Sequence, residues 1–386
     1  MELQELLDSK PLYYTKFDPN RIIEAYELIK DKIKHPKSIQ LIGTNGKGST
    51  GRAVAHLGFM GGLNVGHYTS PHILDFKERF WINGKFATNK ELNIANSKLF
   101  NMLGKNMAQA LSYFEYQTLL AFVLFEDLDL IVIEAGLGGE YDATSVKDYD
   151  LTIITPIGLD HSTFLGDTIK EVATTKLEAI SKKTLIAKQP YKEVLDIAKD
   201  IAQKKNTKLY FYENLSKNKE DDIRKIAIKK AWPDYIIDNI TNATLALDIL
   251  DINYSLKDLE ELELFGRFYK LMPNVIIDVG HNTLAAKAIR NALDKKVNLI
   301  FNILDDKNYK EVLTILKPQI KNLQIIKIST QRATDLNRLE NLLDELNINY
   351  NYFNGKIDSK ENYLVFGSFY VIEAFLKKIG IKEIKA

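Results

Sequence analysis

The stretch Ser38-Ile-Gln-Leu-Ile-Gly-Thr-Asn-Gly-Lys-Gly-Ser-Thr50 decides the fold class of this chain. Its first five residues form a short β-rich run that predicts a buried strand over 38–42. The glycine-rich segment that follows leads into a predicted helix from Ser49 to about Met60. A strand that runs through a glycine loop into a helix is the local pattern of a phosphate-binding site.

The residue types in this loop suit a nucleoside triphosphate. Its three glycines let the backbone wrap closely around phosphates, and the start of the helix aims free N–H groups at them. Lys47 supplies a point charge for the β- and γ-phosphates. A hydroxyl from Ser49 or Thr50 can reach the magnesium ion that accompanies ATP.

The loop departs from the generic P-loop, which has four residues between its first glycine and the Gly-Lys pair. Here two residues lie between Gly43 and Gly46, and Gly48 separates Lys47 from Ser49. A plain glycine turn between a strand and a helix is the alternative interpretation. The Lys-Gly-Ser-Thr sequence after a buried-type strand favours phosphate binding.

Outward from the loop, short β-rich runs alternate with longer helical stretches, which predicts a parallel βαβ sheet whose ligands collect at the carboxyl ends of its strands. The strands predicted for this first domain are 38–42, 64–68, 130–134, 151–157, 184–188 and 208–212, and a helix is predicted over 239–249. The polar segment 251–263 predicts a linker. The charged segment 216–222 predicts a mobile surface loop.

A second α/β series follows and predicts a smaller Rossmann-like domain. Its predicted strands are 274–279, 297–304, 323–329, 349–353 and 363–366. A length of 386 residues exceeds the size at which one core usually stops growing, so two domains are expected. We place the ATP-binding domain at 1–255 and the Rossmann-like domain at 256–386.

Composition excludes several classes of function. The chain has 52 Lys and Arg against 51 Asp and Glu, so no overall field favours nucleic acid or an anionic membrane. Cys is absent, which removes disulfides, thiolate metal sites and a cysteine nucleophile. The charged N-terminus does not resemble a signal peptide, and no apolar stretch is long enough to span a bilayer. A cytoplasmic location is the expectation.

The loop Gly43-Thr-Asn-Gly-Lys-Gly-Ser49 resembles the ATP loop of folylpolyglutamate synthases and dihydrofolate synthases, which belong to the Mur ligase superfamily. Further strings agree in the same order: Tyr68-Thr-Ser-Pro-His72, Tyr113-Phe-Glu115, Glu134-Ala-Gly-Leu-Gly-Gly139, Asp142-Ala-Thr144, Gly158-Leu-Asp-His161, Asn242-Ala243, Gly266-Arg267, Asp278-Val-Gly-His-Asn282, Asp306-Lys307 and Gly367-Ser368. The resemblance implies an α/β fold with an N-terminal P-loop ATPase-like Mur ligase central domain and a smaller C-terminal domain. It also implies that ATP phosphorylates a substrate carboxylate and that the amine of L-glutamate attacks the acyl phosphate.

The family pattern implies two magnesium ions, with Ser49, Ser70, Glu134 and His161 as ligands and Asp160 as the partner that orients His161. It further implies that Lys176 is carbamylated, which turns an ammonium group into a carboxylate-like one. Without the family pattern, Glu134 at a strand end would be interpreted as a surface residue, and His161 as a structural one. Lys176 alone reads as a solvated lysine.

The pattern also implies nucleotide contacts, catalytic groups and substrate contacts. The ATP-binding residues are Asn45, Gly46, Lys47, Gly48, Ser49, Thr50, Asn242, Arg267 and Asp278, and the catalytic ones are Lys47, His161, Lys176 and His281. The substrate-binding residues are Tyr113, Phe114, Glu115 and Tyr141. Tyr113 and Phe114, an aromatic pair at a helix start, also fit core positions. The alternative interpretation of Arg267 is a surface arginine, and that of Asp278 is an aspartate at a strand end.

Four positions depart from the family pattern: Glu140 in place of Arg, Asp238-Asn239 in place of His-Gln, Thr283 in place of Pro, and Asn308 in place of Asp. None of them removes a magnesium ligand. Glu140 reverses a charge near the predicted substrate site.

The predicted function is an ATP-dependent ligase that joins L-glutamate to dihydropteroate, to a folate tail, or to both, in a monomer that binds neither nucleic acid nor membrane. Motifs common to both activities do not separate them. One alternative is another Mur-type amino acid ligase, although only about 40 residues precede Gly43, too few for a typical UDP-binding domain. A nucleotide-binding regulator without ligase activity is the other; it would tolerate loss of Glu134, His161 and Lys176, all of which are present.

Overall fold

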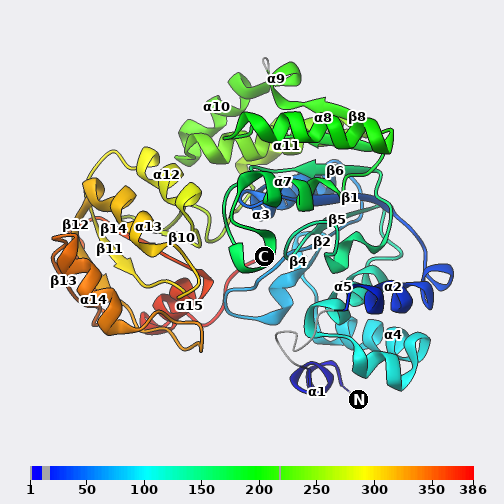
Figure 1. The fold of residues 1–386 in the computed structure, drawn as a ribbon, viewed down its shortest axis with the longest axis horizontal. Coiled ribbons are helices and arrows are strands. Elements are labelled where there is room, and N and C mark those ends of the chain that lie inside the picture. The colour runs from blue at the N-terminus through cyan, green and yellow to red at the C-terminus, as the bar shows by residue number, and fades with distance from the viewer. Residues whose placement is uncertain (1, 11–17, 217–218) are drawn as a thin grey trace.

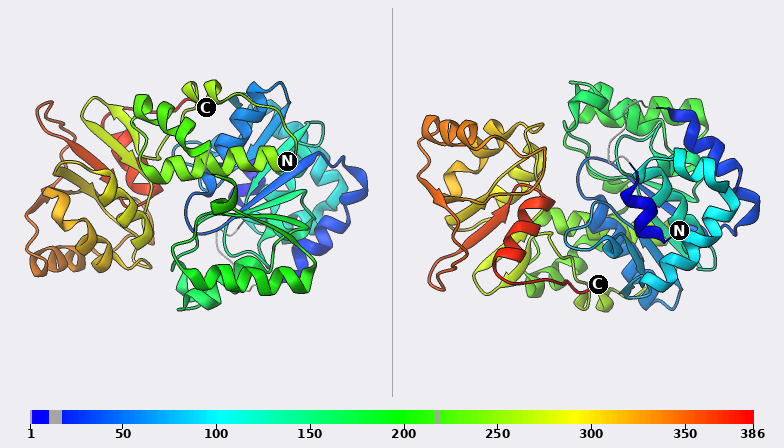
Figure 2. Two further views of the ribbon diagram at one scale, coloured as in Figure 1. Left: turned by 90° about the horizontal axis from the view of Figure 1, so that it is seen from above. Right: turned by 90° about the horizontal axis from the view of Figure 1, so that it is seen from below.

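The protein folds into two lobes, each built on its own β-sheet (Figure 1). The structure is a computed structural model and describes residues 2–10, 18–216 and 219–386. Three views show the two lobes side by side, with the chain passing from the first to the second once (Figures 1 and 2). The predicted α/β class with two sheets is confirmed. No helix in the described ranges is long and apolar enough to cross a membrane.

The first lobe contains an eight-stranded sheet in the order β4-β3-β2-β5-β1-β6-β7-β8. All neighbours from β2 to β8 are parallel, and β3 and β4 add an antiparallel edge. The strands are β1 (Lys37–Ile42), β2 (Val65–Tyr68), β3 (Phe80–Ile82), β4 (Lys85–Phe86), β5 (Leu130–Glu134), β6 (Leu151–Ile154), β7 (Lys183–Ile186) and β8 (Lys208–Phe211).

Eleven α-helices surround this sheet in the described residues. They are α1 (Leu3–Asp8), α2 (Pro19–Glu27), α3 (Lys47–Met60), α4 (Asn89–Ala110), α5 (Tyr113–Leu124), α6 (Ser162–Leu165), α7 (Ile169–Leu177), α8 (Lys192–Lys205), α9 (Tyr212–Leu215), α10 (Lys219–Lys230) and α11 (Asp234–Ile249). Short 3₁₀ turns lie at η1 (Lys30–Lys32), η2 (Phe76–Arg79), η3 (Ala143–Val146) and η4 (Leu256–Glu260).

Both faces of the first sheet are covered, because side chains of a strand alternate between faces. Leu130 and Val132 of β5 pack with α3, α10 and α11, whereas Ile131 and Ile133 pack with α4 and α5. Farther along that second face, α7 and α8 cover β6 and β7. A strand buried on both sides explains the uninterrupted apolar run of β5.

The second lobe has a six-stranded sheet in the order β13-β12-β11-β14-β10-β9, in which only β9 is antiparallel. Helices α12, α13 and α14 cover one face and α15 covers part of the other. The elements are β9 (Tyr269–Met272), β10 (Val275–Asp278), α12 (Thr283–Ala292), β11 (Val297–Phe301), α13 (Tyr309–Leu316), η5 (Lys317–Gln319), β12 (Ile320–Ile325), α14 (Leu336–Glu345), β13 (Tyr350–Tyr352), β14 (Tyr363–Phe366) and α15 (Phe369–Lys378).

The predicted strands all exist, with shifts of a few residues at their ends. The largest errors are the carboxyl ends of 151–157, 297–304 and 323–329, where the chain leaves the sheet earlier. Strands β3, β4 and β9 were not predicted, because antiparallel strands of two to four residues lack a long apolar run. The predicted loop 216–222 is wrong from residue 219 on, where α10 begins, and residues 217 and 218 lie outside the described part.

The predicted linker 251–263 is not a free linker, because it folds onto the first lobe. It contains η4, and Leu259 and Leu262 are buried in the same core as α3 and α11. Leu264 belongs to this core as well. The domain boundary at 255/256 stays a prediction.

Close packing behind the phosphate loop depends on a glycine after β5. A Cβ atom at Gly139 would lie 2.6 Å from the carbonyl oxygen of Lys176 and 2.7 Å from its Cα. The next residue, Glu140, donates its backbone N–H to Thr175 at 3.0 Å. The loop after β5 and the helix α7 are therefore in backbone contact, which fixes where Lys176 lies.

We predict that Gly139→Ala lowers the free energy of unfolding of the first lobe by ~1–3 kcal/mol, the usual cost of inserting a methyl group into a packed site. Urea denaturation followed by fluorescence reports on this lobe, because the only tryptophans, Trp81 and Trp232, belong to it. Glu140→Ala at the exposed neighbour is the control and is expected to change stability by less than ~0.5 kcal/mol. Equal effects of the two substitutions would contradict the backbone contact.

Candidate functional site

A cavity of about 430 Å³ lies where the two lobes meet. Its walls come from the loops after β1, β5 and β6 of the first lobe, from α11, and from the loop after β10 together with α12 of the second. Most of the predicted site residues line it: Asn45, Gly46, Lys47, Gly48, Ser49, Ser70, Glu134, His161, Lys176, Asn242, Arg267, Asp278 and His281. The carboxyl ends of parallel strands thus form one pocket, as the fold class leads us to expect.

The loop after β1 has the backbone geometry of an anion site. Helix α3 begins at Lys47, and Gly46 before it has φ 88°, a left-handed conformation that favours glycine. A Cβ atom at Gly46 would lie 2.5 Å from the side-chain oxygen of Asn239, so the loop also has no room for one. The free N–H groups and the positive end of the dipole of this 14-residue helix point into the cavity.

Two lysines meet at a single carbonyl of this loop. The ammonium groups of Lys47 and Lys176 each donate to the carbonyl of Gly43 at 3.1 Å. Lys176 is 4% exposed, and burial together with the charge of Lys47 lowers its pKa to about 7. Within the described residues no carboxylate hydrogen-bonds to either lysine, which favours a bound anion. Burial and the nearby charge of Lys47 make Lys176 a neutral amine in a large part of the molecules at neutral pH.

Glu134 and Arg267 converge on the loop from opposite lobes. A Cβ atom at Gly48 would lie 3.1 Å from Nη2 of Arg267 and 3.6 Å from Oε2 of Glu134. Glu134 is 4% exposed and accepts hydrogen bonds from the hydroxyl of Thr69 and, at 3.4 Å, from the N–H of Ser70. The guanidinium of Arg267 packs over the ring of Phe369, 5.1 Å from its centroid, which holds the charge at the cavity wall.

His161 has a strained backbone. Its φ of 54° is uncommon for a residue other than glycine, and such strain concentrates at functional sites. Burial lowers the pKa of its imidazole to about 4, although the charge of Asp160 opposes the shift. The ring is therefore neutral at pH 7 and has a nitrogen lone pair for a metal ion.

Asp160 does not orient His161 as predicted. Its carboxylate accepts a hydrogen bond from the backbone N–H of His161 at 2.9 Å but lies 4.0 Å from the ring nitrogen, too far for a hydrogen bond, and its other contacts are with the second lobe. It pairs with Nζ of Lys307 at 2.5 Å, accepts a hydrogen bond from Asn282 at 3.1 Å, and lies 3.5 Å from His281. The prediction failed because 147 residues separate Asp160 from Lys307 along the chain.

The interlobe cluster of Asp160, Lys307, His281 and Asn282 is largely shielded from solvent. The side chains of Asp160 and Lys307 are 8% and 3% exposed. Burial by itself would raise the pKa of Asp160, but His281, His161 and Lys307 together lower it well below its ordinary value. The amides of Asn282 and Asn45 join the same cluster to the phosphate loop through hydrogen bonds of 2.8 and 3.0 Å.

Asp278 forms a second connection between the lobes. Its carboxylate accepts hydrogen bonds from the hydroxyl of Tyr235 on α11 and from the N–H groups of Phe268 and Gly280, at 2.7–2.8 Å. Burial raises the pKa of Asp278, and the neighbouring Arg267 opposes the shift. These hydrogen bonds hold the side chain of Asp278 in place in the cavity wall. Its predicted contact with ATP stays a prediction.

Asn242 presents an unsatisfied acceptor. Its Nδ2 donates to the carbonyl of Asp238 at 2.8 Å, and its Oδ1 is buried with no hydrogen-bond partner among the residues that the structure describes. Because the side chain lines the cavity, a ligand amine is a suitable donor. Thr50 also has a buried hydroxyl without a partner, but it does not line the cavity.

The four predicted substrate residues do not line this cavity. Glu115 is engaged elsewhere, since it caps α5 through Ser112 and pairs with Arg21 at 3.0 Å. Phe114 packs on Gly136, where a Cβ atom would lie 2.5 Å from the ring, and Tyr113 is half-buried beside Phe76. Tyr141 is 56% exposed on the loop after β5. Their roles in binding a substrate stay predictions.

Sequence reasoning gave no role to Lys307 or Asn282, although both stand in motifs that were recognised. The signal that could have found Lys307 is an isolated lysine just after a buried strand, in the string Asp306-Lys307. Such a residue lies near the carboxyl edge of the second lobe's sheet, where ligands of α/β folds collect.

The cavity contains donors that suit magnesium. Ser49 and Ser70 carry hydroxyls, Glu134 a carboxylate and His161 a neutral imidazole, and oxygen donors are the ligands that Mg²⁺ prefers. No group of three or more His, Asp or Glu side chains gathers into a metal cage within the described ranges. The donor set therefore fits an ion bound jointly by the protein and by phosphate oxygens.

Known proteins are similar to this chain in sequence and in fold. No family model matches the chain. The dihydrofolate synthase/folylpolyglutamate synthase of Buchnera aphidicola subsp. Schizaphis graminum is 31% identical over 366 residues, which cover 86% of each chain. The crystal structure of Helicobacter pylori folylpolyglutamate synthetase is 37% identical, with a TM-score of 0.79 over 98% of this chain and 97% of that one. E. coli FolC in complex with DHPP and ADP is 25% identical, with a TM-score of 0.82 and 98% coverage of both.

We predict that Lys307→Met weakens the binding of magnesium ATP at least about tenfold, measured by calorimetric titration. Removing one partner of a buried ion pair destabilises a protein by ~3–5 kcal/mol. Because this pair joins the two lobes, a substantial part of that free energy destabilises the closed arrangement that forms the cavity.

Lys310→Met is the matched control, because Lys310 pairs with Glu345 at 2.6 Å in the same lobe with both side chains more than half exposed. Such a pair is worth ~0–1 kcal/mol, so its loss should leave the affinity for ATP almost unchanged. If both variants bind ATP equally well, the buried pair does not maintain the cavity.

Proposed function

Since this chain belongs to the dihydrofolate synthase/folylpolyglutamate synthase family, we propose that it is an ATP-dependent ligase that joins L-glutamate to dihydropteroate, to a folate tail, or to both. The observation that carries the proposal is the convergence of Lys47, Lys176 and Arg267 around the glycine loop, in a cavity that both lobes close. The cations Lys47 and Arg267 at a helix N-terminus suit a triphosphate and the negative charge that moves when it reacts.

The proposed reaction has two steps. A carboxylate oxygen of the acceptor attacks the γ-phosphorus of ATP, the bond from that phosphorus to the β,γ-bridging oxygen breaks, and ADP leaves. The amine of L-glutamate then attacks the acyl carbon, phosphate leaves, and the nitrogen gives up a proton, which completes the amide. Both steps concentrate negative charge on phosphate oxygens.

The side chains of the cavity divide this work. Lys47 and the N–H groups at the start of α3 hold the phosphates, and Arg267 from the second lobe balances charge on the transferred group. His281 is oriented by a 3.0 Å contact between Nδ1 and the carbonyl of Val279, which leaves Nε2 toward Asp160 at 3.5 Å. Ser49, Ser70, Glu134 and His161 would hold two magnesium ions, which would supply further neutralisation of the phosphate charge.

We also propose that Lys176 is carbamylated. A neutral amine adds to CO₂ and releases a proton, and the lowered pKa makes the neutral form abundant near pH 7. The resulting carbamate would be an anion beside Lys47, which removes the repulsion between the two ammonium groups. A monomeric state and a cytoplasmic location complete the proposal.

A test of the function compares two acceptors in the presence of ATP, magnesium and L-glutamate. Release of ADP that requires both glutamate and either dihydropteroate or tetrahydrofolate, with a glutamylated product detected by mass spectrometry, is the expected result. Turnover with dihydropteroate alone would assign dihydrofolate synthase activity, and turnover with tetrahydrofolate alone would assign folylpolyglutamate synthase activity. ATP hydrolysis that depends on neither acceptor nor glutamate would favour the nucleotide-binding regulator.

We predict that Lys47→Ala lowers kcat about 100-fold or more, because it removes a charged donor at a site where transition-state charge develops. Steady-state kinetics measure the effect, and the fluorescence of the two tryptophans checks that the first lobe is folded. Lys90→Ala, at an exposed position on α4, is the control and should retain full activity. An unchanged rate constant in Lys47→Ala would refute its role.

We predict that labelled bicarbonate gives a ¹³C carbamate signal on this protein and none on Lys176→Ala. Folding lowers the pKa of Lys176 from 10.5 to about 7, so the protonated amine is disfavoured in the folded state and its share falls as pH rises through 7. Carbamate and ligase activity should therefore both decrease below about pH 7. Full activity of Lys176→Ala in CO₂-free buffer would exclude the carbamate.

A further inference from the structure

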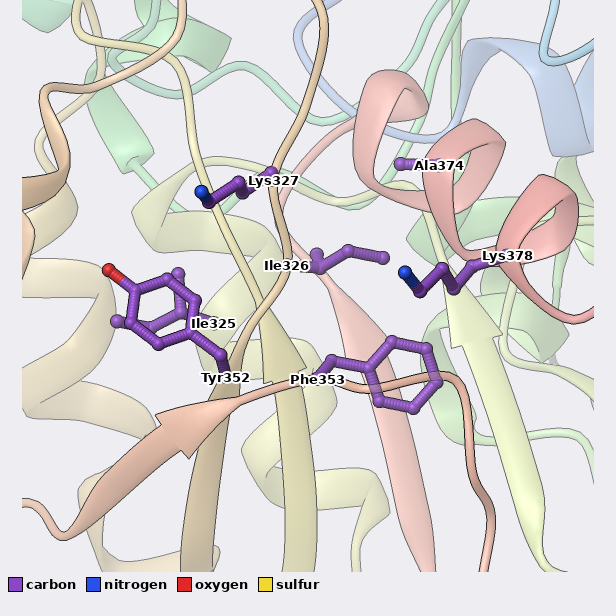
Figure 3. A pocket seen from close by; sticks show the side chains of 7 residues that line it. All are labelled: Ile325, Ile326, Lys327, Tyr352, Phe353, Ala374 and Lys378. Atoms are coloured by element: carbon purple, nitrogen blue, oxygen red, sulfur yellow. The ribbon is translucent and has the colours of Figure 1, made fainter.

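A second cavity of about 400 Å³ lies entirely within the second lobe. It is formed where β12 and β13 end, beside α15 (Figure 3). Its walls consist of Ile325, Ile326, Lys327, Tyr352, Phe353, Ala374 and Lys378. None of these residues lines the cavity between the lobes, so the two cavities are distinct.

The floor of this cavity is apolar and firmly packed. Ile325 and Ile326 are 1% and 4% exposed, and the ring of Phe353 lies 5.5 Å from that of Phe375 beneath it. Tyr352 is 45% exposed, and its hydroxyl donates to Glu340 at 2.6 Å. Because the hydroxyl is engaged, the ring itself is the surface that Tyr352 offers to a ligand.

Two lysines flank this floor from different elements. Figure 3 shows Lys327, which follows β12, and Lys378, at the end of α15, on opposite sides of Ile326. Nζ of Lys327 lies 5.8 Å from the centre of the Tyr352 ring. The stem of Lys378 passes Gly355, where a Cβ atom would lie 3.4 Å from its Cγ. Neither lysine forms an ion pair with a carboxylate of the described residues.

We propose that this cavity binds a small organic dianion whose two negative groups are joined by an apolar, preferably aromatic, body. The apolar floor takes the body, and the ring of Tyr352 packs against it. Lys327 and Lys378 each hold one negative group, because they lie at opposite sides of the floor and lack an anionic partner. The volume is that of a small-molecule site rather than of a protein interface. This inference is independent of the proposed ligase function.

Terephthalate is the probe, and benzoate and inorganic phosphate are the comparison ligands in ligand-observed NMR titrations of the full chain. Terephthalate has a charge at each end of an aromatic ring, benzoate keeps the ring and one charge, and phosphate has charge without a ring. The expected result is that terephthalate binds more tightly than either, by about two- to fivefold relative to benzoate, since the one additional, partly exposed ion pair is worth ~0.2–1 kcal/mol.

Lys327→Ala and Lys378→Ala should each weaken terephthalate binding to about the level of benzoate. Lys287→Ala, at an exposed position on α12, should leave it unchanged, as should Lys47→Ala in the other cavity. Equal affinities for terephthalate and benzoate, or for terephthalate and phosphate, would overturn the proposal. Loss of binding in Lys47→Ala would overturn it as well, because the ligand would then occupy the phosphate loop.

Discussion

The buried carboxylate of Asp160 is the constraint on which the site depends. A carboxylate this well shielded from water is stable only if cations and donors surround it, and the first lobe does not supply enough of them. Lys307, His281 and Asn282 all come from the second lobe. These contacts hold the lobes in the arrangement that places Arg267 beside the glycine loop and closes the cavity.

A second constraint acts inside the cavity, where the fold gathers positive charge. The start of α3, Lys47, Lys176 and Arg267 all face a small volume that carries few carboxylates near the loop. In a medium of low dielectric constant such charges repel one another, and an incoming triphosphate relieves the repulsion. In the proposed reaction, the same positive charges that repel one another in the pocket would hold the phosphate oxygens.

The sequence was most informative where one residue pattern had one physical meaning. Strands β5 and β14 were predictable because a strand buried on both faces is mostly apolar, and the glycine loop after β1 was predictable because Gly46 needs a left-handed backbone. The short antiparallel strands β3, β4 and β9 carry no such pattern. The interlobe pair of Asp160 and Lys307 was not predictable, because only the tertiary fold brings together residues so far apart. The aromatic segment at 113–115 was ambiguous for another reason, since packing and ligand binding select the same side chains.

The central claim is that the cavity activates a carboxylate by attaching phosphate to it. Dihydropteroate or folate labelled with ¹⁸O in the acceptor carboxylate tests this claim directly, because an acyl phosphate passes one carboxylate oxygen to the phosphate that leaves. The account predicts one ¹⁸O atom in inorganic phosphate for each amide bond formed, measured by mass spectrometry. Amide formation with unlabelled phosphate would contradict it.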